Sequence, residues 1–153
     1  MPANRLKNFL NQEGVKYVAI SHSPAYTAQE IAASAHVRGQ DLAKTVMVWL
    51  DSQMAMAVVP ANRMVVLPDL REASGAREVR VATEAEFKKG FPDCEIGAMP
   101  PFGNLYGMEV HVAQTLTEDE QIVFNAGTHS ELIKMAYADF ARLVRPKVAS
   151  FST

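Results

Sequence analysis

The spacing of apolar and polar residues predicts a chain of short helices and strands. Apolar side chains fall on one helical face over residues 3–13, and Gly14 follows at a position where glycine commonly ends a helix. Residues 17–22 are rich in strand formers. Residues 27–30 (TAQE) form a capping box, in which a threonine hydroxyl and a glutamate carboxylate each satisfy a free backbone N–H. This box predicts a further helix, ending before Gly39.

Two apolar runs give the strongest strand signal in the chain. Residues 45–50 (TVMVWL) and 54–59 (MAMAVV) flank a short polar segment, residues 51–53. A short polar gap between two strand-forming runs predicts a β-hairpin. Because both runs are almost entirely apolar, we expect both faces of the hairpin to be buried.

The second half of the chain predicts more short strands with small helices between them. We expect strands at residues 64–67, 78–81, 109–113, 121–126 and 132–135, and helices at residues 69–74, after a second capping box at residues 83–86, and at residues 139–144 with Asp139 as its cap. Residues 97–107 (GAMPPFGNLYG) contain too many glycines and prolines for a regular element and predict an ordered loop. Since no regular βαβα rhythm is present, the pattern favours an α+β fold with a mixed, curved sheet over a doubly wound one.

Length and composition narrow the class of protein. A chain of 153 residues without a linker or repeat predicts one domain over residues 1–153. With 48% hydrophobic residues and a net charge of -2, neither a disordered chain nor a strongly basic nucleic-acid binder is expected. The single cysteine, Cys94, excludes an internal disulfide and fits a reducing compartment. With no signal-peptide pattern and no apolar run of membrane-spanning length, we expect a cytoplasmic protein that does not contact a membrane.

Most familiar catalytic patterns are missing from the sequence. The four histidines, His22, His36, His111 and His129, have no partner at metal-ligand spacing, so we expect no metal and no cofactor. Cys94 stands between Asp93 and Glu95, which raise the pKa of a thiol and so disfavour a nucleophile. No nucleophile elbow, phosphate-binding loop or dinucleotide fingerprint occurs.

Two features remain as candidates for chemistry. Lys44 precedes the apolar run 45–50; its ammonium either reaches solvent or is directed by a rigid strand at a phosphate or carbonyl. Residues 97–103 (GAMPPFG) form either a tight surface loop or a preorganised wall whose backbone approaches a ligand closely. Glycine permits such an approach, and the two prolines keep the loop rigid.

The order of four short motifs resembles one known family. Lys44-Thr45-Val46, then residues 58–61 (VVPA), then residues 97–103 with their GxxxP pattern, and then residues 127–129 (GTH) occur as in the YbaK/prolyl-tRNA synthetase-associated editing domains. The resemblance covers roughly residues 15–145. It implies a barrel-like mixed sheet with surrounding helices and a freestanding enzyme that hydrolyses mischarged aminoacyl-tRNA, typically tRNA(Pro) with a small amino acid such as alanine.

The resemblance also implies a site. The family lysine matches Lys44, and the family glycine and proline match Gly97 and Pro101. We expect Lys44 and the Gly97 backbone to be catalytic, with oxyanion stabilisation by backbone N–H groups and water attack assisted by the ribose 2′-OH. The expected substrate contacts are Thr45, Met47, Ala98, Met99, Pro100, Pro101, Gly103, Gly127 and His129.

The expected partner is the 3′ CCA end of an aminoacyl-tRNA, with an aminoacyl-tRNA synthetase as a further candidate and no DNA. Candidate phosphate contacts are Arg77, Arg80, Lys88, Lys89, Arg142, Arg145 and Lys147. Two alternatives stay open on the sequence alone. One is a non-catalytic module that binds tRNA ends or a synthetase through the same pocket, and the other is a hydrolase of small esters.

Overall fold

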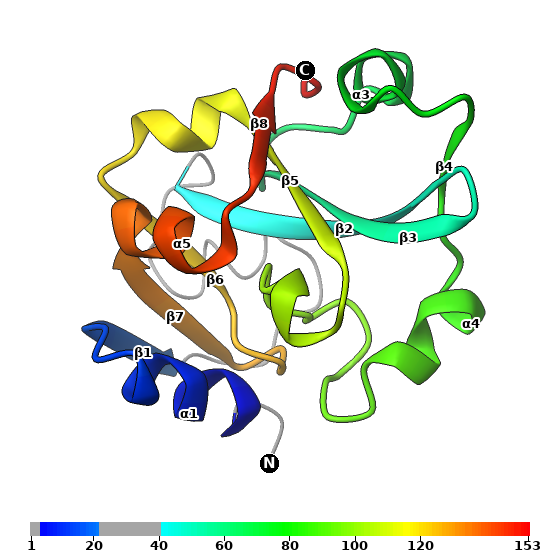
Figure 1. The fold of residues 1–153 in the computed structure, drawn as a ribbon. Helices are drawn as coiled ribbons and strands as arrows, with labels where there is room; N and C mark the ends of the chain where they lie inside the picture. Colours follow the sequence, from blue (N-terminus) through cyan, green and yellow to red (C-terminus); the bar gives the residue numbers. More distant parts are fainter. Residues whose placement is uncertain (1–3, 22–40) are drawn as a thin grey trace.

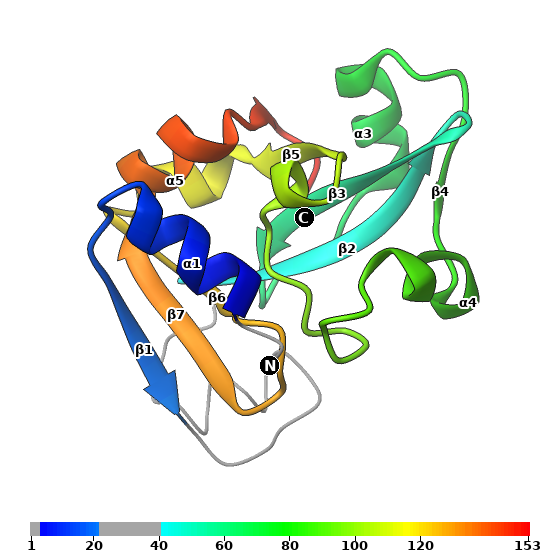
Figure 2. The same cartoon turned by 60° about the horizontal axis from the view of Figure 1, so that its bottom comes forward.

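The computed structural model describes residues 4–21 and 41–153, which build an eight-stranded sheet with helices around it (Figures 1 and 2). The strands are β1 (Tyr17–Ser21), β2 (Leu42–Leu50), β3 (Gln53–Pro60), β4 (Val79–Val81), β5 (Glu109–Ala113), β6 (Gln121–Asn125), β7 (Glu131–Ala136) and β8 (Lys147–Ala149). The helices are α1 (Asn4–Gln12), α3 (Leu67–Ser74), α4 (Glu84–Phe87) and α5 (Tyr137–Val144), with the 3₁₀ turns η1 (Lys88–Gly90), η2 (Gly103–Leu105) and η3 (Gln114–Glu118). None of the helices in this described part is long and apolar enough to cross a bilayer.

The sheet mixes parallel and antiparallel pairs, which confirms the predicted α+β class. Its strand order is β1-β7-β6-β2-β3-β5-β8, with β4 attached to β2 beside this path. The pairs β2–β6, β3–β5 and β5–β8 are parallel, and the others are antiparallel. Barrel-like closure stays a prediction.

The predicted hairpin is confirmed and lies at the centre of the molecule (Figure 1). Its turn places Asp51 at a φ of 56°, a left-handed conformation that costs most residues free energy. The Asp51 carboxylate offsets this cost by accepting hydrogen bonds from the backbone N–H groups of Arg77 and Glu78, both at 3.0 Å. The turn therefore also holds the chain that leads into β4.

Both faces of the hairpin are buried, as the apolar runs predict. Met47 and Met56 belong to one core cluster, which includes the packed rings of Phe102, Phe124 and Phe140. The alternate residues of β2 and β3 belong to a second cluster under α3, which contains Leu70 and Phe151. The hairpin thus separates two apolar layers and is a rigid base for residues at its ends.

Several local predictions are confirmed and others are wrong. The capping box at Thr83 is present with both of its hydrogen bonds, and α3 ends at Gly75 in the left-handed conformation. Residues 64–67 do not form a strand, because Val65 makes only an isolated bridge and Leu67 starts α3. Helix α5 begins at Tyr137, so Asp139 lies in its first turn and is not its cap. The helix predicted after residues 27–30 lies outside the described residues.

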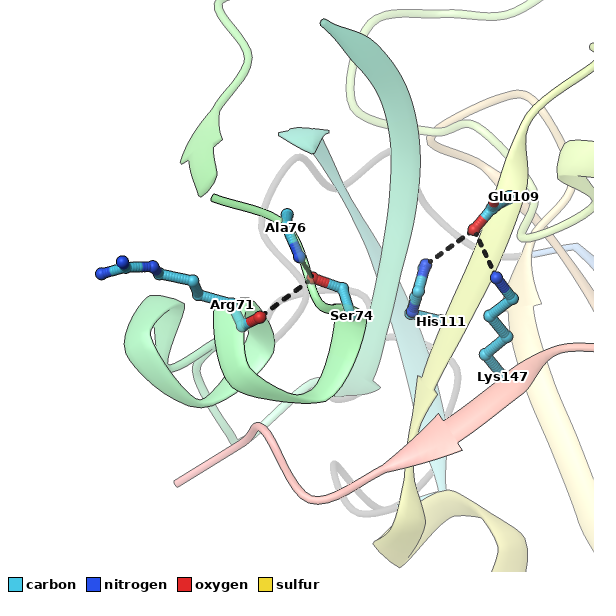
Figure 3. A network of polar contacts seen from close by, with 6 residues as sticks. All are labelled: Arg71, Ser74, Ala76, Glu109, His111 and Lys147. Carbon is cyan, nitrogen blue, oxygen red and sulfur yellow. Dashed lines mark hydrogen bonds and ion pairs between the residues drawn. The ribbon is translucent and has the colours of Figure 1, made fainter. Parts of the chain in front are cut away.

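A buried histidine lies on β5, next to the edge strand β8 (Figure 3). His111 on β5 is only 3% exposed, and its Nε2 lies 3.3 Å from the Glu109 carboxylate. The same carboxylate accepts a hydrogen bond of 3.0 Å from Lys147, the β8 residue that pairs with His111. Burial lowers the pKa of His111, although Glu109 acts in the opposite direction. The folded protein therefore favours neutral His111.

We expect the free energy of unfolding to fall as the pH drops below about 6.5, the ordinary histidine pKa. In that range the unfolded chain takes up a proton at His111 that the folded chain resists, so stability is lost as pH falls. The midpoint of urea unfolding at about pH 7.5 and about pH 5.5 measures the effect. The variant His111→Gln should show a smaller difference between the two midpoints. An equal difference in both proteins would contradict this account.

Candidate functional site

The edge of β2 that faces away from β3 has a gap in its strand pairing. Along this edge β2 pairs with β6 over Leu42 and Ala43, and with β4 from Val48 to Leu50. Between them, the Met47 carbonyl accepts a hydrogen bond of 2.9 Å from the backbone N–H of Ala82. Residues 44–46, here called the β2 gap, have no strand partner on this edge within the described ranges 4–21 and 41–153. Lys44 is thus the first residue after the parallel strands β2 and β6 separate.

The glycine–proline segment is fixed to the end of β6 at this point of separation. The backbone N–H of Glu95 donates to the Gly127 carbonyl at 2.8 Å, and the backbone N–H of Gly127 donates to the Ala98 carbonyl at 2.9 Å. Residues 95–99, here called the site loop, therefore lie beside the turn that follows β6. Because Phe124 pairs with Ala43, the loop and the β2 gap belong to the same part of the molecule.

Within this part, the imidazole ring of His129 lies beside Gly97. Gly97 has a φ of +86°, and a Cβ at this position would lie 3.4 Å from Cε1 of His129. The imidazole Nε2 lies 2.6 Å from the Ile96 carbonyl oxygen. A carbonyl can only accept, so Nε2 carries the proton and donates. The His129 backbone N–H in turn donates to the Glu95 carboxylate at 2.7 Å.

The Lys44 side chain is half-buried, and burial lowers its pKa. No carboxylate in the described part of the chain forms an ion pair with it. On the neighbouring strand, Asn125 follows Phe124 as Lys44 follows Ala43. The Asn125 side-chain oxygen is buried and has no hydrogen-bond partner in the described ranges. Buried polar groups without partners are rare, so the unpaired oxygen makes the junction of β2 and β6 a candidate binding site for a polar ligand.

Two hollows adjoin the site loop. An open depression is lined by Glu84, Phe87, Cys94, Glu95, Ile96, Gly97 and His129. A smaller pocket of about 140 Å³ shares four of these residues and is completed by Lys88, Phe91, Pro92 and Met99. A small apolar pocket beside free backbone donors can select a ligand by size and hold a carbonyl next to it.

The structure brings part of the predicted site together. Gly97, Ala98, Gly127 and His129 form the contacts described above, and Met99 lines the small pocket. Thr45 lies in the β2 gap, whereas Met47 is 3% exposed and belongs to the core. The remaining predicted contacts, Pro100, Pro101 and Gly103, are buried. A Cβ on Gly103 would lie 2.6 Å from the Met108 carbonyl oxygen, so close packing alone requires a glycine at this position.

Sequence reasoning missed three residues of this site. Glu95 anchors both the site loop and His129, Phe87 lines both hollows, and Asn125 presents the unpaired buried oxygen. None of them stands in a recognisable motif, because each acts through a partner far away in the sequence. The expectation for Cys94 agrees with the structure: the pKa of its thiol is raised, first by burial and also by Asp93.

The basic residues proposed for phosphate contacts are not equally available. Arg80 forms a double hydrogen bond with Glu86 at 3.0 and 2.9 Å and lies over the Trp49 ring. Lys147 is held by Glu109, and Arg142 lies 3.5 Å from Asp139. Lys88 is exposed and lines the small pocket beside the site loop. Its position makes it the member of this set that lies at the candidate site.

Comparison with known proteins identifies what this arrangement is similar to. The sequence model of the aminoacyl-tRNA editing domain matches residues 22–143. The multifunctional Ser/Thr-tRNA deacylase ProXp-y of Escherichia coli K12 is 25% identical over 155 residues, which cover 96% of this chain and 90% of that protein.

Solved structures show the same fold at lower sequence identity. The crystal structure of the hypothetical protein APE2540 superposes with a TM-score of 0.86 at 19% identity and covers 97% of this chain and 99% of that one. A candidate trans-editing enzyme for prolyl-tRNA synthetase superposes with a TM-score of 0.82 at 21% identity, with 99% and 97% coverage. The family predicted from the four motifs is therefore confirmed, and with it the enzyme class, an aminoacyl-tRNA deacylase.

Proposed function

Because the chain belongs to the aminoacyl-tRNA editing domain family, we propose that it acts in trans on the 3′ CCA end of mischarged tRNA and hydrolyses the ester of a small non-cognate amino acid. The observation that supports this proposal is that the site loop is hydrogen-bonded to the chain just after β6, while Lys44 lies where β2 separates from β6. Such an enzyme is needed because a synthetase pocket gains only about 1–3 kcal/mol of discrimination per methylene.

The backbone of the site loop supports a specific catalytic role. The Ala98 N–H is already bound to the Glu95 carbonyl at 3.0 Å, so it is not available to a substrate. The N–H groups of Gly97 and Met99 have no acceptor among residues 4–21 and 41–153. They are the candidates for stabilising the oxyanion that forms when water attacks the ester carbonyl.

The remaining steps follow from the chemistry of the substrate. An aminoacyl ester is already activated, so positioning and charge stabilisation replace a side-chain nucleophile. The vicinal ribose 2′-OH assists the attacking water, and the ester bond then breaks to release the amino acid and the tRNA 3′ end. The Lys44 ammonium binds a phosphate or the aminoacyl carbonyl beside the loop.

Two observations point to different amino acids and tRNAs as the substrate. The motif resemblance favours alanine on tRNA(Pro), whereas the E. coli relative is named for Ser- and Thr-tRNA. The small pocket of about 140 Å³ is consistent with a short side chain in each case.

The test is release of labelled amino acid from a panel of Ala-, Ser-, Thr- and Pro-charged tRNAs. We expect hydrolysis of at least one small non-cognate ester and protection of cognate Pro-tRNA(Pro). Binding of tRNA without release from any member would instead support the non-catalytic module. Hydrolysis of small esters without tRNA would favour the small-ester hydrolase.

A further inference from the structure

We propose that His129 is a positioning residue, which holds the peptide between Ile96 and Gly97 so that the Gly97 N–H is presented to the ester carbonyl. The inference rests on the proposed function, and it assigns His129 a task different from direct contact with the substrate. The Gly97 backbone touches the reacting atoms, and His129 acts through it.

The geometry of one peptide group carries the argument. His129 Nε2 donates to the Ile96 carbonyl oxygen at 2.6 Å, a short hydrogen bond made by a side chain that is only 8% exposed. A trans peptide is planar, with its C=O and N–H pointing in opposite directions. Fixing the Ile96 carbonyl toward the imidazole therefore turns the Gly97 N–H away from it, where no acceptor from the described ranges occupies it.

Further contacts hold His129 itself in place. Its backbone N–H donates to the Glu95 carboxylate at 2.7 Å, and the Glu95 N–H donates to the Gly127 carbonyl at 2.8 Å. The ring edge packs where a side chain of Gly97 would begin, 3.4 Å from the Cβ position. A hydrogen bond fixed at both ends in this way preorganises a backbone donor before the substrate arrives.

The same geometry argues against Nε2 of His129 as the general base. The nitrogen that faces the site loop is a donor to a carbonyl, and a base must offer a lone pair to the attacking water. The expected kinetic signature is therefore that of a lost oxyanion donor. The rate of the chemical step should fall while ground-state binding is preserved.

The experiment compares three variants in deacylation of the tRNA that the panel identifies. His129→Ala should lower kcat by about 10²-fold per folded enzyme, with KM changed less than about threefold. His129→Gln can place an amide N–H near the Ile96 carbonyl and should recover at least about tenfold of that loss. His111→Gln, the matched control at a buried histidine on β5, should leave kcat and KM unchanged. A rise in KM at constant kcat, or Gln no better than Ala, would overturn the proposal.

A second measurement separates this proposal from the proposed function. The backbone amide of Gly97 can be followed by ¹H–¹⁵N NMR in wild type and in His129→Ala, without any substrate. The resonance should shift and broaden in the variant, because the peptide loses its anchor, while the amide of Gly75 should not move. An unchanged Gly97 amide would overturn the positioning role even if the enzyme is active. If the panel shows no hydrolysis, the proposed function fails, and with it the catalytic meaning of the anchor.

Discussion

Replacing Lys44 by alanine should lower kcat/KM for aminoacyl-tRNA hydrolysis by at least about 10²-fold, the size of effect seen when one group that stabilises transition-state charge is removed. The Lys44 side chain is half-buried at the point where β2 separates from β6, and burial lowers its pKa. Among residues 4–21 and 41–153 it has no acidic partner that offsets this desolvation. A cation held in this way gains its full interaction only when a negatively charged or strongly polar ligand arrives.

The matching stability measurement makes this prediction specific to function. Lys44→Met keeps the length and apolar stem of the side chain but removes the charge, so its free energy of unfolding should be unchanged or larger than that of wild type. As a control, Lys7→Ala removes a lysine that pairs with Glu131 at 2.8 Å and should leave hydrolysis unchanged. Normal turnover by Lys44→Met, or a marked loss of its stability, would show that the lysine has a structural task.

The parts of the fold that the sequence predicts correctly are those fixed by neighbouring residues. The capping box at Thr83, the Gly75 helix stop and the β2–β3 hairpin each depend on residues a few positions apart. Strand β8 was missed because it has only three residues, two of them exposed, and exists through its parallel pairing with β5. The apolar run 64–67 resembles a strand, but Pro68 suits the first turn of a helix.

The candidate site likewise contains some residues that local sequence predicts and others that depend on distant partners. Lys44 and Gly97 are visible in the sequence, since a cation before an apolar strand and a glycine–proline loop are local signals. The hydrogen bonds that shape the site loop join Glu95 to Gly127 and His129. Along the sequence, β5 and β6 lie between Glu95 and these two residues. Only the parallel pairing of β2 with β6 brings Lys44 to the same junction. No pattern within a short window of sequence contains that information.

Gly97→Ala should affect both stability and catalysis, and the two effects have separate causes. At a φ of +86° any L side chain is strained, by roughly 1–2 kcal/mol in the left-handed region. The new methyl group would also lie 3.4 Å from Cε1 of His129, at the near limit of van der Waals contact, so relaxation of the strained loop should shift the ring or the peptide. Since the ring anchors the Ile96 carbonyl, that shift should turn the Gly97 N–H and lower kcat by about tenfold or more.

A second glycine separates strain from the local contact. Gly75 has a similar φ of +76°, but nothing lies within 4 Å of its Cβ position. Gly75→Ala should therefore show the conformational cost of roughly 1–2 kcal/mol in urea unfolding and no change in deacylation. The difference between the two variants measures what the His129 contact adds. Suppose instead that Gly97→Ala keeps wild-type kcat and loses the same stability as Gly75→Ala. That result would mean that position 97 requires glycine only for its positive φ. It would contradict the role of the loop backbone as the donor in the reaction.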